Sequence, residues 1–247
     1  MFASLPMYDR ATTADANDRF WALIREEYGS GPDRLSRDLD LHSSWESPDM
    51  LLSQTCGLPF RTVLHGKVNY VCTPDYGLRG CAPGYYRSMI AVRHDDPRRK
   101  LAEFDGATLA RNDVLSQSGW GSIWNHLAET GADIRFGRIV DTGAHAVSAE
   151  AVAIGEADIA ALDAATWILL KRESDIGRRL RAIGHTRPTP GLPYITAKTV
   201  DPEPLFAAMQ RALARLSQRD RARLLIKRLV RIQEADYLLE PNPPREN

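Results

Sequence analysis

The alternation of short apolar runs with amphipathic segments between residues 97 and 170 constrains the fold more than any other feature. Each apolar run has the length of a strand, and each segment after it has apolar residues at helical spacing. Strands are expected at 107–110, 134–140 and 159–162, and helices at 120–129, 148–154 and 164–170. Repeated strand–helix units predict a mostly parallel sheet with helices on both faces, so this part of the chain is expected to form an α/β lobe.

Composition narrows the class of protein. The 247 residues are enough for one large domain or two lobes, and 43% hydrophobic with 26% charged residues is typical of a soluble globular protein. The formal net charge is zero, so nothing indicates a nucleic-acid partner or an anionic membrane surface. Met1 to Asp9 lacks the basic and apolar regions of a signal peptide. We therefore expect either a cytoplasmic protein or an exported one whose signal is absent from this sequence.

The segment Asn112–Trp120 carries the strongest functional signal. It is a polar turn that follows a predicted strand and precedes a predicted helix. Backbone N–H groups and the positive end of the helix face such a turn, and both attract anions. Ser116 and Ser118, with Gln117 between them, add hydroxyl groups, and Gly119 allows a ligand to approach the main chain. The turn is therefore predicted to bind a phosphate-like group.

Further polar residues are expected at the same sheet edge. Tyr8, His145 and Asp163 each lie at the end of a predicted strand or in the loop after it. The carboxyl ends of strands in an open α/β sheet share one edge, where ligands bind. His145 can donate a hydrogen bond to an anion, and Asp163 can accept one from a protonated anion oxygen or pair with a ligand amine.

A short helix is predicted at residues 50–56, because Ser47-Pro48-Asp49 has the composition of a helix start. Gln54 and Thr55 would lie on its last turn, where they are either ligand contacts or ordinary polar residues of a helix end.

Each candidate also has a structural alternative. Ser118 could be a helix N-cap, Asp163 could cap the helix that begins at residue 164, and His145 could bond a loop carbonyl. Tyr8 could be a packed aromatic residue. A serine hydrolase would need Gly-x-Ser-x-Gly, and the run Leu115–Gly119 lacks the first glycine. Phosphate-loop, dinucleotide and metal-ligand spacings are absent, so neither a cofactor nor a metal is expected.

The three cysteines, Cys56, Cys72 and Cys81, are too few for a disulfide scaffold or a zinc site. If the protein is exported, Cys56 and Cys81 can form one disulfide. The alternative is that all three cysteines are thiols.

Short motifs along most of residues 1–200 match a known family. They are Met7-Tyr8, Gln54-Thr55-Cys56-Gly57, Tyr86-Arg87-Ser88, Ser116-Gln117-Ser118-Gly119, Gly143-Ala144-His145, the run from Ala151 to Asp163, and Pro188-Thr189-Pro190-Gly191. By these motifs the chain resembles the phosphate/phosphonate branch of the periplasmic substrate-binding proteins of ABC importers, which have the bilobal type II, transferrin-like architecture. The most specific part of the likeness is 143–163.

The resemblance implies two α/β lobes, each a mostly parallel sheet flanked by helices, joined by two crossing segments. By position, the first lobe would comprise 1–88 and the return at 184–247 with the C-terminal helices, and the second lobe 89–183. Ser116, Ser118 and His145 would hold the phosphoryl oxygens. Tyr8 would reach the ligand from the other lobe, and Asp163 would meet a ligand amine or hydroxyl.

The implied function is that of a monomeric importer component, not an enzyme, which binds a small oxyanion between its lobes by hinge closure. An ABC permease of the inner membrane is the expected partner, and the periplasm is the expected compartment if an export signal has been removed. Two alternatives stay open. An intracellular lyase or biosynthetic enzyme on the same scaffold would use Asp163 and His145 as acid and base. A ligand-sensing domain of a regulator is the other, although no DNA-binding helices accompany the lobes.

Overall fold

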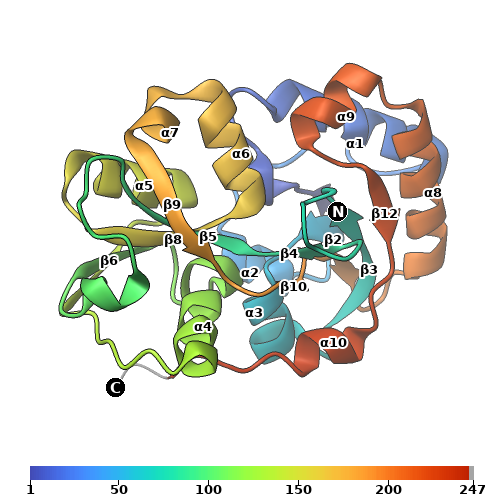
Figure 1. The fold of residues 1–247 in the computed structure, drawn as a ribbon. Helices are drawn as coiled ribbons and strands as arrows, with labels where there is room; N and C mark the ends of the chain where they lie inside the picture. Colours follow the sequence, from blue (N-terminus) through green and yellow to red (C-terminus); the bar gives the residue numbers. More distant parts are fainter. Residues whose placement is uncertain (245–247) are drawn as a thin grey trace. The chain divides into compact units, whose positions relative to one another are not determined.

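The chain forms two compact α/β units. The structure is a computed structural model that describes residues 1–244 (Figure 1). Unit 1 comprises Met1–Tyr85 and Pro190–Leu239, and unit 2 comprises Tyr86–Thr189 with the segment that begins at Glu240. The short strands β4 (Tyr85–Tyr86) and β10 (Thr189–Pro190), where the chain passes between the units, pair with each other. No helix within residues 1–244 has the length and apolar character needed to span a bilayer.

Unit 1 is built on a five-stranded sheet with the order β1-β2-β11-β3-β12. Its strands are β1 (Phe2–Ala3), β2 (Met50–Gln54), β3 (Val68–Asp75), β11 (Tyr194–Ala197) and β12 (Arg228–Val230). Its helices are α1 (Ala14–Tyr28), α2 (Leu41–Trp45), α3 (Gly57–Pro59), α8 (Pro202–Arg215), α9 (Gln218–Leu224) and α10 (Glu234–Leu238), with helical turns at Pro6–Tyr8 and Phe60–Leu64. β1 and β2 are parallel, whereas β11 is antiparallel to β2 and β3.

The core of unit 1 follows from the apolar spacing of its segments. Helix α1 buries Phe20, Trp21 and Ile24 completely or nearly so, and it packs along α8. A second cluster contains Phe60, Tyr237 and residues of β2, β3 and β11. The sheet of unit 1 is therefore held by apolar side chains from segments far apart in the sequence.

The helix predicted at residues 50–56 is wrong, because Met50–Gln54 forms strand β2. All five residues are buried, and a run that is buried on every side has no periodicity that separates a strand from a helix. Pairing with β1 on one side and β11 on the other determines the strand. Gln54 therefore ends a strand and Thr55 follows it, at the carboxyl edge of a sheet.

Unit 2 contains a second five-stranded sheet, with the order β7-β6-β8-β5-β9. Its strands are β5 (Ser88–Arg93), β6 (Thr108–Arg111), β7 (Arg138–Asp141), β8 (Ile159–Asp163) and β9 (Leu180–His185). Its helices are α4 (Ser122–Thr130), α5 (His145–Ile154), α6 (Ala164–Glu173) and α7 (Asp175–Arg179), with helical turns at Leu101–Phe104 and Gln117–Gly121. β6 is parallel to β7 and β8, and β5 is antiparallel to β8 and β9.

Both faces of the unit 2 sheet are covered, as the strand–helix alternation predicts. Along β8, Ala160 and Leu162 pack with α5 and α6, whereas Ile159 and Ala161 pack on the other face with Trp120 and Ile123. This is the period of two expected of a strand that is buried on both sides. Figure 1 shows α4 on one side of this sheet and α5 to α7 on the other.

Two predicted helix starts in unit 2 differ from the structure. Helix α5 begins at His145, not near Ser148, because the Ala144 carbonyl accepts the first hydrogen bond, from the Ser148 amide at 2.9 Å. The helical turn before α4 begins at Gln117, and Ser116 is its N-cap. Both differences place a candidate residue inside the first turn of a helix instead of the loop before it.

The C-terminal segment also differs from the expectation that 184–247 returns wholly to the first lobe. Both carboxylate oxygens of Glu240 accept hydrogen bonds from Arg187, at 2.8 and 2.6 Å. The carbonyl of Pro241 accepts one from Asn125 at 3.3 Å. These contacts place Glu240 and Pro241 with unit 2. Residues 245–247 lie outside the described part of the chain.

Candidate functional site

The serine turn of unit 2 uses its two hydroxyls differently. Ser116 Oγ accepts a hydrogen bond from the Gly119 amide at 2.9 Å, and the Ser116 carbonyl accepts from the amides of Trp120 and Gly121. Ser116 therefore caps the turn, and these three amides are satisfied within it. Ser118, in the first helical turn, has no capping role and directs its hydroxyl elsewhere. The amides of Gly119, Trp120 and Gly121 are accordingly not free to bind a ligand in this conformation.

Gly119 is required by the close approach of a neighbouring side chain. A Cβ atom built on Gly119 would lie 1.8 Å from Asn112 Oδ1 and 3.2 Å from His145 Cε1. No side chain fits there, so glycine keeps Asn112 and His145 against the backbone of the serine turn. Gln117 is buried, with 1% of its surface exposed.

Ser118 and His145 form the central contact of the site. Ser118 Oγ lies 2.8 Å from His145 Nε2. The serine follows β6 and the histidine follows β7, and these strands are parallel neighbours in register from Thr108 to Arg111. The two side chains meet because both follow the carboxyl ends of adjacent parallel strands.

Asp163 is the third member of this cluster. It ends β8 and is 2% exposed, and its Oδ2 lies 3.6 Å from His145 Nε2. Its Oδ1 accepts a hydrogen bond from the Thr166 amide at 2.9 Å, so it also caps α6. The capping alternative and the clustering with His145 are therefore both correct, one for each carboxylate oxygen.

The cluster does not have the geometry of a hydrolytic triad. In a Ser-His-Asp triad the serine and the aspartate bond opposite nitrogens of the imidazole. Here Ser118 and Asp163 both face Nε2, and Nδ1 has no partner among residues 1–244. The histidine cannot pass a proton from serine toward aspartate in this arrangement, so the cluster is suited to binding.

Burial lowers the pKa of His145, and the negative charge of Asp163 opposes part of that shift. The neutral imidazole has one N–H donor and one acceptor. The Nδ1 atom of His145 is buried without a hydrogen-bond partner in the described part of the chain, and so is Oδ1 of Asn112. Buried polar groups left without partners destabilise a protein, and their concentration around the serine turn is what a ligand site would show.

Two serines that were not predicted as site residues, Ser88 and Ser122, support the same turn. Ser88 Oγ donates to the Ser118 carbonyl at 2.8 Å, and Ser122 Oγ donates to Ser88 Oγ at 3.0 Å. Ser88 begins β5 and lies opposite Asp163 in the antiparallel pair of β5 and β8. Ser88 belongs to the motif Tyr86-Arg87-Ser88, but only the register of β5 and β8 shows that it lies opposite Asp163, and Ser122 lies in none of the motifs quoted above.

In unit 1, three predicted residues lie at or near the carboxyl edge of the sheet. The half-buried ring of Tyr8 packs edge-on against Tyr76, with 5.3 Å between ring centroids. Gln54 donates from Nε2 to the Leu192 carbonyl at 3.1 Å and to Tyr76 Oη at 3.3 Å, so its amide has a structural role. Thr55 is completely buried, and its Oγ1 has no partner among the described residues.

The three cysteines are thiols in the structure, so the bridge considered between Cys56 and Cys81 is not formed. Cys56 follows β2, Cys81 lies in the loop after β3, and both are half-buried. Within residues 1–244, no group of three or more histidine, cysteine or acidic side chains could hold a metal ion.

Comparisons with solved structures show the fold. A binding protein component of an ABC phosphonate transporter from Pseudomonas aeruginosa superposes with a TM-score of 0.72 at 15% identity, over 96% of this chain and 83% of that one. PhnD1 from Prochlorococcus marinus, in complex with methylphosphonate, gives 0.72 at 14% identity over 96% and 94%. MatC from Rhodopseudomonas palustris, with bound malate, gives 0.63 at 12% identity over 97% and 94%. The bilobal α/β fold predicted from the sequence is thereby confirmed.

The sequence itself assigns the family. No curated protein matches it. The family model described as the periplasmic substrate-binding protein of phosphonate ABC transporters matches residues 67–237, which is more than half of the chain and includes the serine turn, His145 and Asp163. The chain therefore belongs to the family of periplasmic substrate-binding proteins of phosphonate ABC transporters.

Proposed function

We propose that this chain binds a small tetrahedral oxyanion of the phosphate or phosphonate class, with the hydroxyl of Ser118 and the imidazole of His145 as its principal contacts in unit 2. The observation that carries the proposal is the pair formed by these side chains, 2.8 Å apart, beside a His145 Nδ1 that is buried without a partner. A serine hydroxyl and an imidazole N–H are neutral donors to a phosphoryl oxygen.

Asp163 decides which form of the anion is bound. Its carboxylate would repel a fully ionised phosphonate, but it can accept a hydrogen bond from a protonated ligand oxygen or from a ligand amine. Oδ1 of Asp163 already accepts a hydrogen bond from the Thr166 amide, so Oδ2 is the oxygen that would meet the ligand. Oδ2 lies beside His145 Nε2, and the ligand would bind there. The site is thus proposed to favour the monoprotonated oxyanion or an aminophosphonate over the bare dianion.

The proposal includes the way the protein works. A ligand that contacts both units stabilises the closed state because it binds that state more tightly than the open state. The difference between the two affinities sets how far the equilibrium shifts. Hinge closure on the ligand, a monomeric state, and delivery in the periplasm to an ABC permease are the expectations that accompany membership of the family. The enzymatic alternative has no support from the family, and the two contacts to a single nitrogen of His145 argue against an acid–base relay.

Isothermal calorimetry with phosphate, methylphosphonate, phosphite, 2-aminoethylphosphonate and sulfate tests the proposal. We expect binding of at least one phosphorus oxyanion, with sulfate weaker because it has no protonated oxygen to donate to Asp163 at neutral pH. Ser118→Ala should weaken that binding, whereas Ser30→Ala, an exposed serine in unit 1, should not. Absence of binding to every phosphorus oxyanion would refute the proposed ligand class.

A further inference from the structure

Arg10 has a buried guanidinium nitrogen with no hydrogen-bond partner in the described part of the chain. Its Nη1 is one of few buried side-chain nitrogens or oxygens in residues 1–244 for which the structure contains no hydrogen bond. Arginine cannot lose its charge at physiological pH, so it cannot avoid this situation by deprotonation. A buried cationic donor without a partner costs more than a neutral one and is retained where something else supplies the partner.

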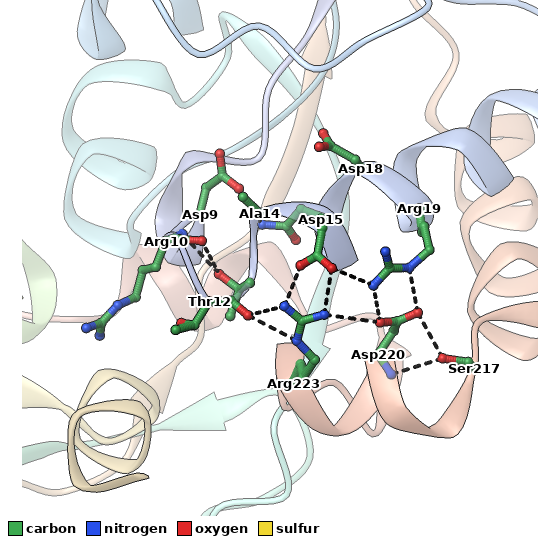
Figure 2. A network of polar contacts seen from close by, with 12 residues as sticks. Asp9, Arg10, Thr12, Ala14, Asp15, Asp18, Arg19, Ser217, Asp220 and Arg223 are labelled. Atoms are coloured by element: carbon green, nitrogen blue, oxygen red, sulfur yellow. Dashed lines mark hydrogen bonds and ion pairs between the residues drawn. The ribbon is translucent and has the colours of Figure 1, made fainter. Parts of the chain in front are cut away.

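Asp9 and Asp15, acidic residues close to Arg10 in the sequence, bind other arginines. Asp9 accepts from Arg37 at 2.6 Å, and Asp15 accepts from Arg19 at 3.1 Å and from Arg223. Figure 2 shows this network of α1 and α9, with the Arg10 side chain directed away from it and no dashed line reaching its guanidinium. The network therefore leaves the charge of Arg10 uncompensated by the acids of its own segment.

The backbone of Arg10 is fixed, so the side chain starts from a defined point. Its amide donates to Thr13 Oγ1 at 2.9 Å, and its carbonyl accepts from the amides of Thr13 and Ala14 at 2.9 and 2.7 Å. These bonds tie Arg10 to the first turn of α1. The Arg10 side chain therefore extends from an ordered helix start and not from a loose loop.

Arg10 and Thr55 lie in segments that follow two neighbouring strands of the unit 1 sheet. The chain reaches Arg10 after β1 and Thr55 directly after β2, and these strands are parallel neighbours with Phe2 opposite Met50. The helical turn Pro6–Tyr8, which leads to Arg10, contacts β2. Carboxyl ends of adjacent parallel strands meet at one edge, the edge where ligands of open α/β sheets bind. Two buried polar groups of unit 1 that have no hydrogen-bond partner among the described residues, Arg10 Nη1 and Thr55 Oγ1, therefore belong to segments that follow neighbouring strands.

We infer that Arg10 and Thr55 form an anion subsite on unit 1, in which the guanidinium supplies a permanent positive charge and the threonine a hydroxyl donor. The subsite rests on the proposed oxyanion function and narrows it. An arginine recognises the oxygens of a phosphonate, a phosphate or a carboxylate, and it repels an ammonium group. The ligand is accordingly one that presents anionic oxygen to unit 1, and a simple phosphonate, a phosphate or a phosphonocarboxylate fits better than an aminophosphonate.

Calorimetry and thermal unfolding on the full chain test this subsite with the variants Arg10→Met, Arg10→Lys, Thr55→Val and, as the matched control, the exposed Arg34→Met. The ligands are phosphate, methylphosphonate, phosphonoacetate, 2-aminoethylphosphonate and malate. Loss of one charge-assisted contact should weaken the best ligand about 10- to 100-fold in Arg10→Met and less in Arg10→Lys, with no change in Arg34→Met. Without ligand, the Tm of Arg10→Met should equal or exceed that of the natural chain, because an unpaired buried charge is removed.

The outcomes separate the subsite from the proposed function. If the natural chain binds a phosphorus oxyanion and Arg10→Met binds it equally well, the subsite is refuted and the proposed function stands. If only malate binds and it requires Arg10, the subsite stands and the proposed ligand class fails. Binding of no anion, or a lower Tm of ligand-free Arg10→Met together with unchanged affinity, would overturn the subsite, since Arg10 would then be a structural residue.

Discussion

Ser118 Oγ lies 2.8 Å from His145 Nε2, and this contact joins the turns that follow two parallel strands. Ser118→Ala should weaken oxyanion binding about 10- to 100-fold, because one hydrogen bond to a charged ligand contributes about 1.5–3 kcal/mol. Folding should change little, since Ser116 and not Ser118 caps the turn. Calorimetry measures the affinity and thermal unfolding checks the fold. An unchanged dissociation constant would place the ligand elsewhere.

Asp163→Asn separates the two roles of this side chain. Asparagine retains an oxygen that can accept from the Thr166 amide, so the cap of α6 should persist and Tm should fall by only a few degrees. In the natural chain, affinity should decline as pH rises through the second pKa of the ligand, since Asp163 accepts from the protonated form. The variant should lose most of that pH dependence. Calorimetry between pH 6 and 8.5 measures the affinity of both proteins. If affinity has the same pH dependence in both, Asp163 does not have the assigned role.

Gly119→Ala should disrupt the serine turn. The added methyl group would lie 1.8 Å from Asn112 Oδ1, so either the turn or Asn112 must move. We expect a destabilisation of about 1–3 kcal/mol, as for overpacked sites, together with weakened ligand binding. Denaturant unfolding measures the destabilisation, and calorimetry measures the ligand affinity. The double variant with Asn112→Ala should recover part of the stability, and absence of any recovery would mean that the clash is not with Asn112.

The convergence of Ser118, His145 and Asp163 could be predicted because it depends on topology alone. Each residue follows or ends a strand of a parallel set, β6, β7 and β8, whose carboxyl ends must share an edge. The strands themselves were visible as apolar runs of the right length. This part of the site therefore needed no knowledge of packing, only the order of strands and helices.

Other features depend on contacts that a single sequence does not reveal. Met50–Gln54 is a strand because two strands from distant segments flank it, and its own pattern fits a helix equally well. Ser88 faces Asp163 only through the antiparallel register of β5 and β8. Arg10 is one of many arginines in the sequence, and only the folded structure shows that its Nη1 is buried without a hydrogen-bond partner among residues 1–244. Such information arises from tertiary structure, which overrides local propensity.

Stability should fall as the pH decreases from about 7 to 5, and His145 should account for part of the loss. Burial lowers the pKa of His145 in the folded protein, whereas in the unfolded chain it titrates near its usual value of about 6.5. Below that value the unfolded state binds more protons, so the free energy of unfolding decreases. Burial shifts His126 in the same direction. His145→Asn and His126→Asn should each flatten the pH dependence of urea unfolding, and an unchanged slope in His145→Asn would show that its imidazole is not buried in the neutral form.

Ion pairs join α1 to α9 (Figure 2) and should contribute to the stability of the fold. Asp220 is 5% exposed and accepts from Arg19 Nε at 2.9 Å and from Arg19 Nη2 at 2.6 Å. Arg19 is about half exposed, so solvent weakens its attraction to Asp220. Asp220→Ala should therefore lower the free energy of unfolding by about 1–2 kcal/mol.

The pH dependence of this pair has the opposite origin from that of His145. The Arg19 guanidinium lowers the pKa of Asp220, so its contribution is complete above the usual aspartate pKa of about 3.9 and is lost as the pH falls through the lowered value. The stability difference between the natural chain and Asp220→Ala should therefore be constant from pH 8 to 5 and shrink only in strong acid. Urea unfolding across this range measures it, and a difference that already disappears by pH 5 would mean that Arg19 does not hold the carboxylate in its ionised form.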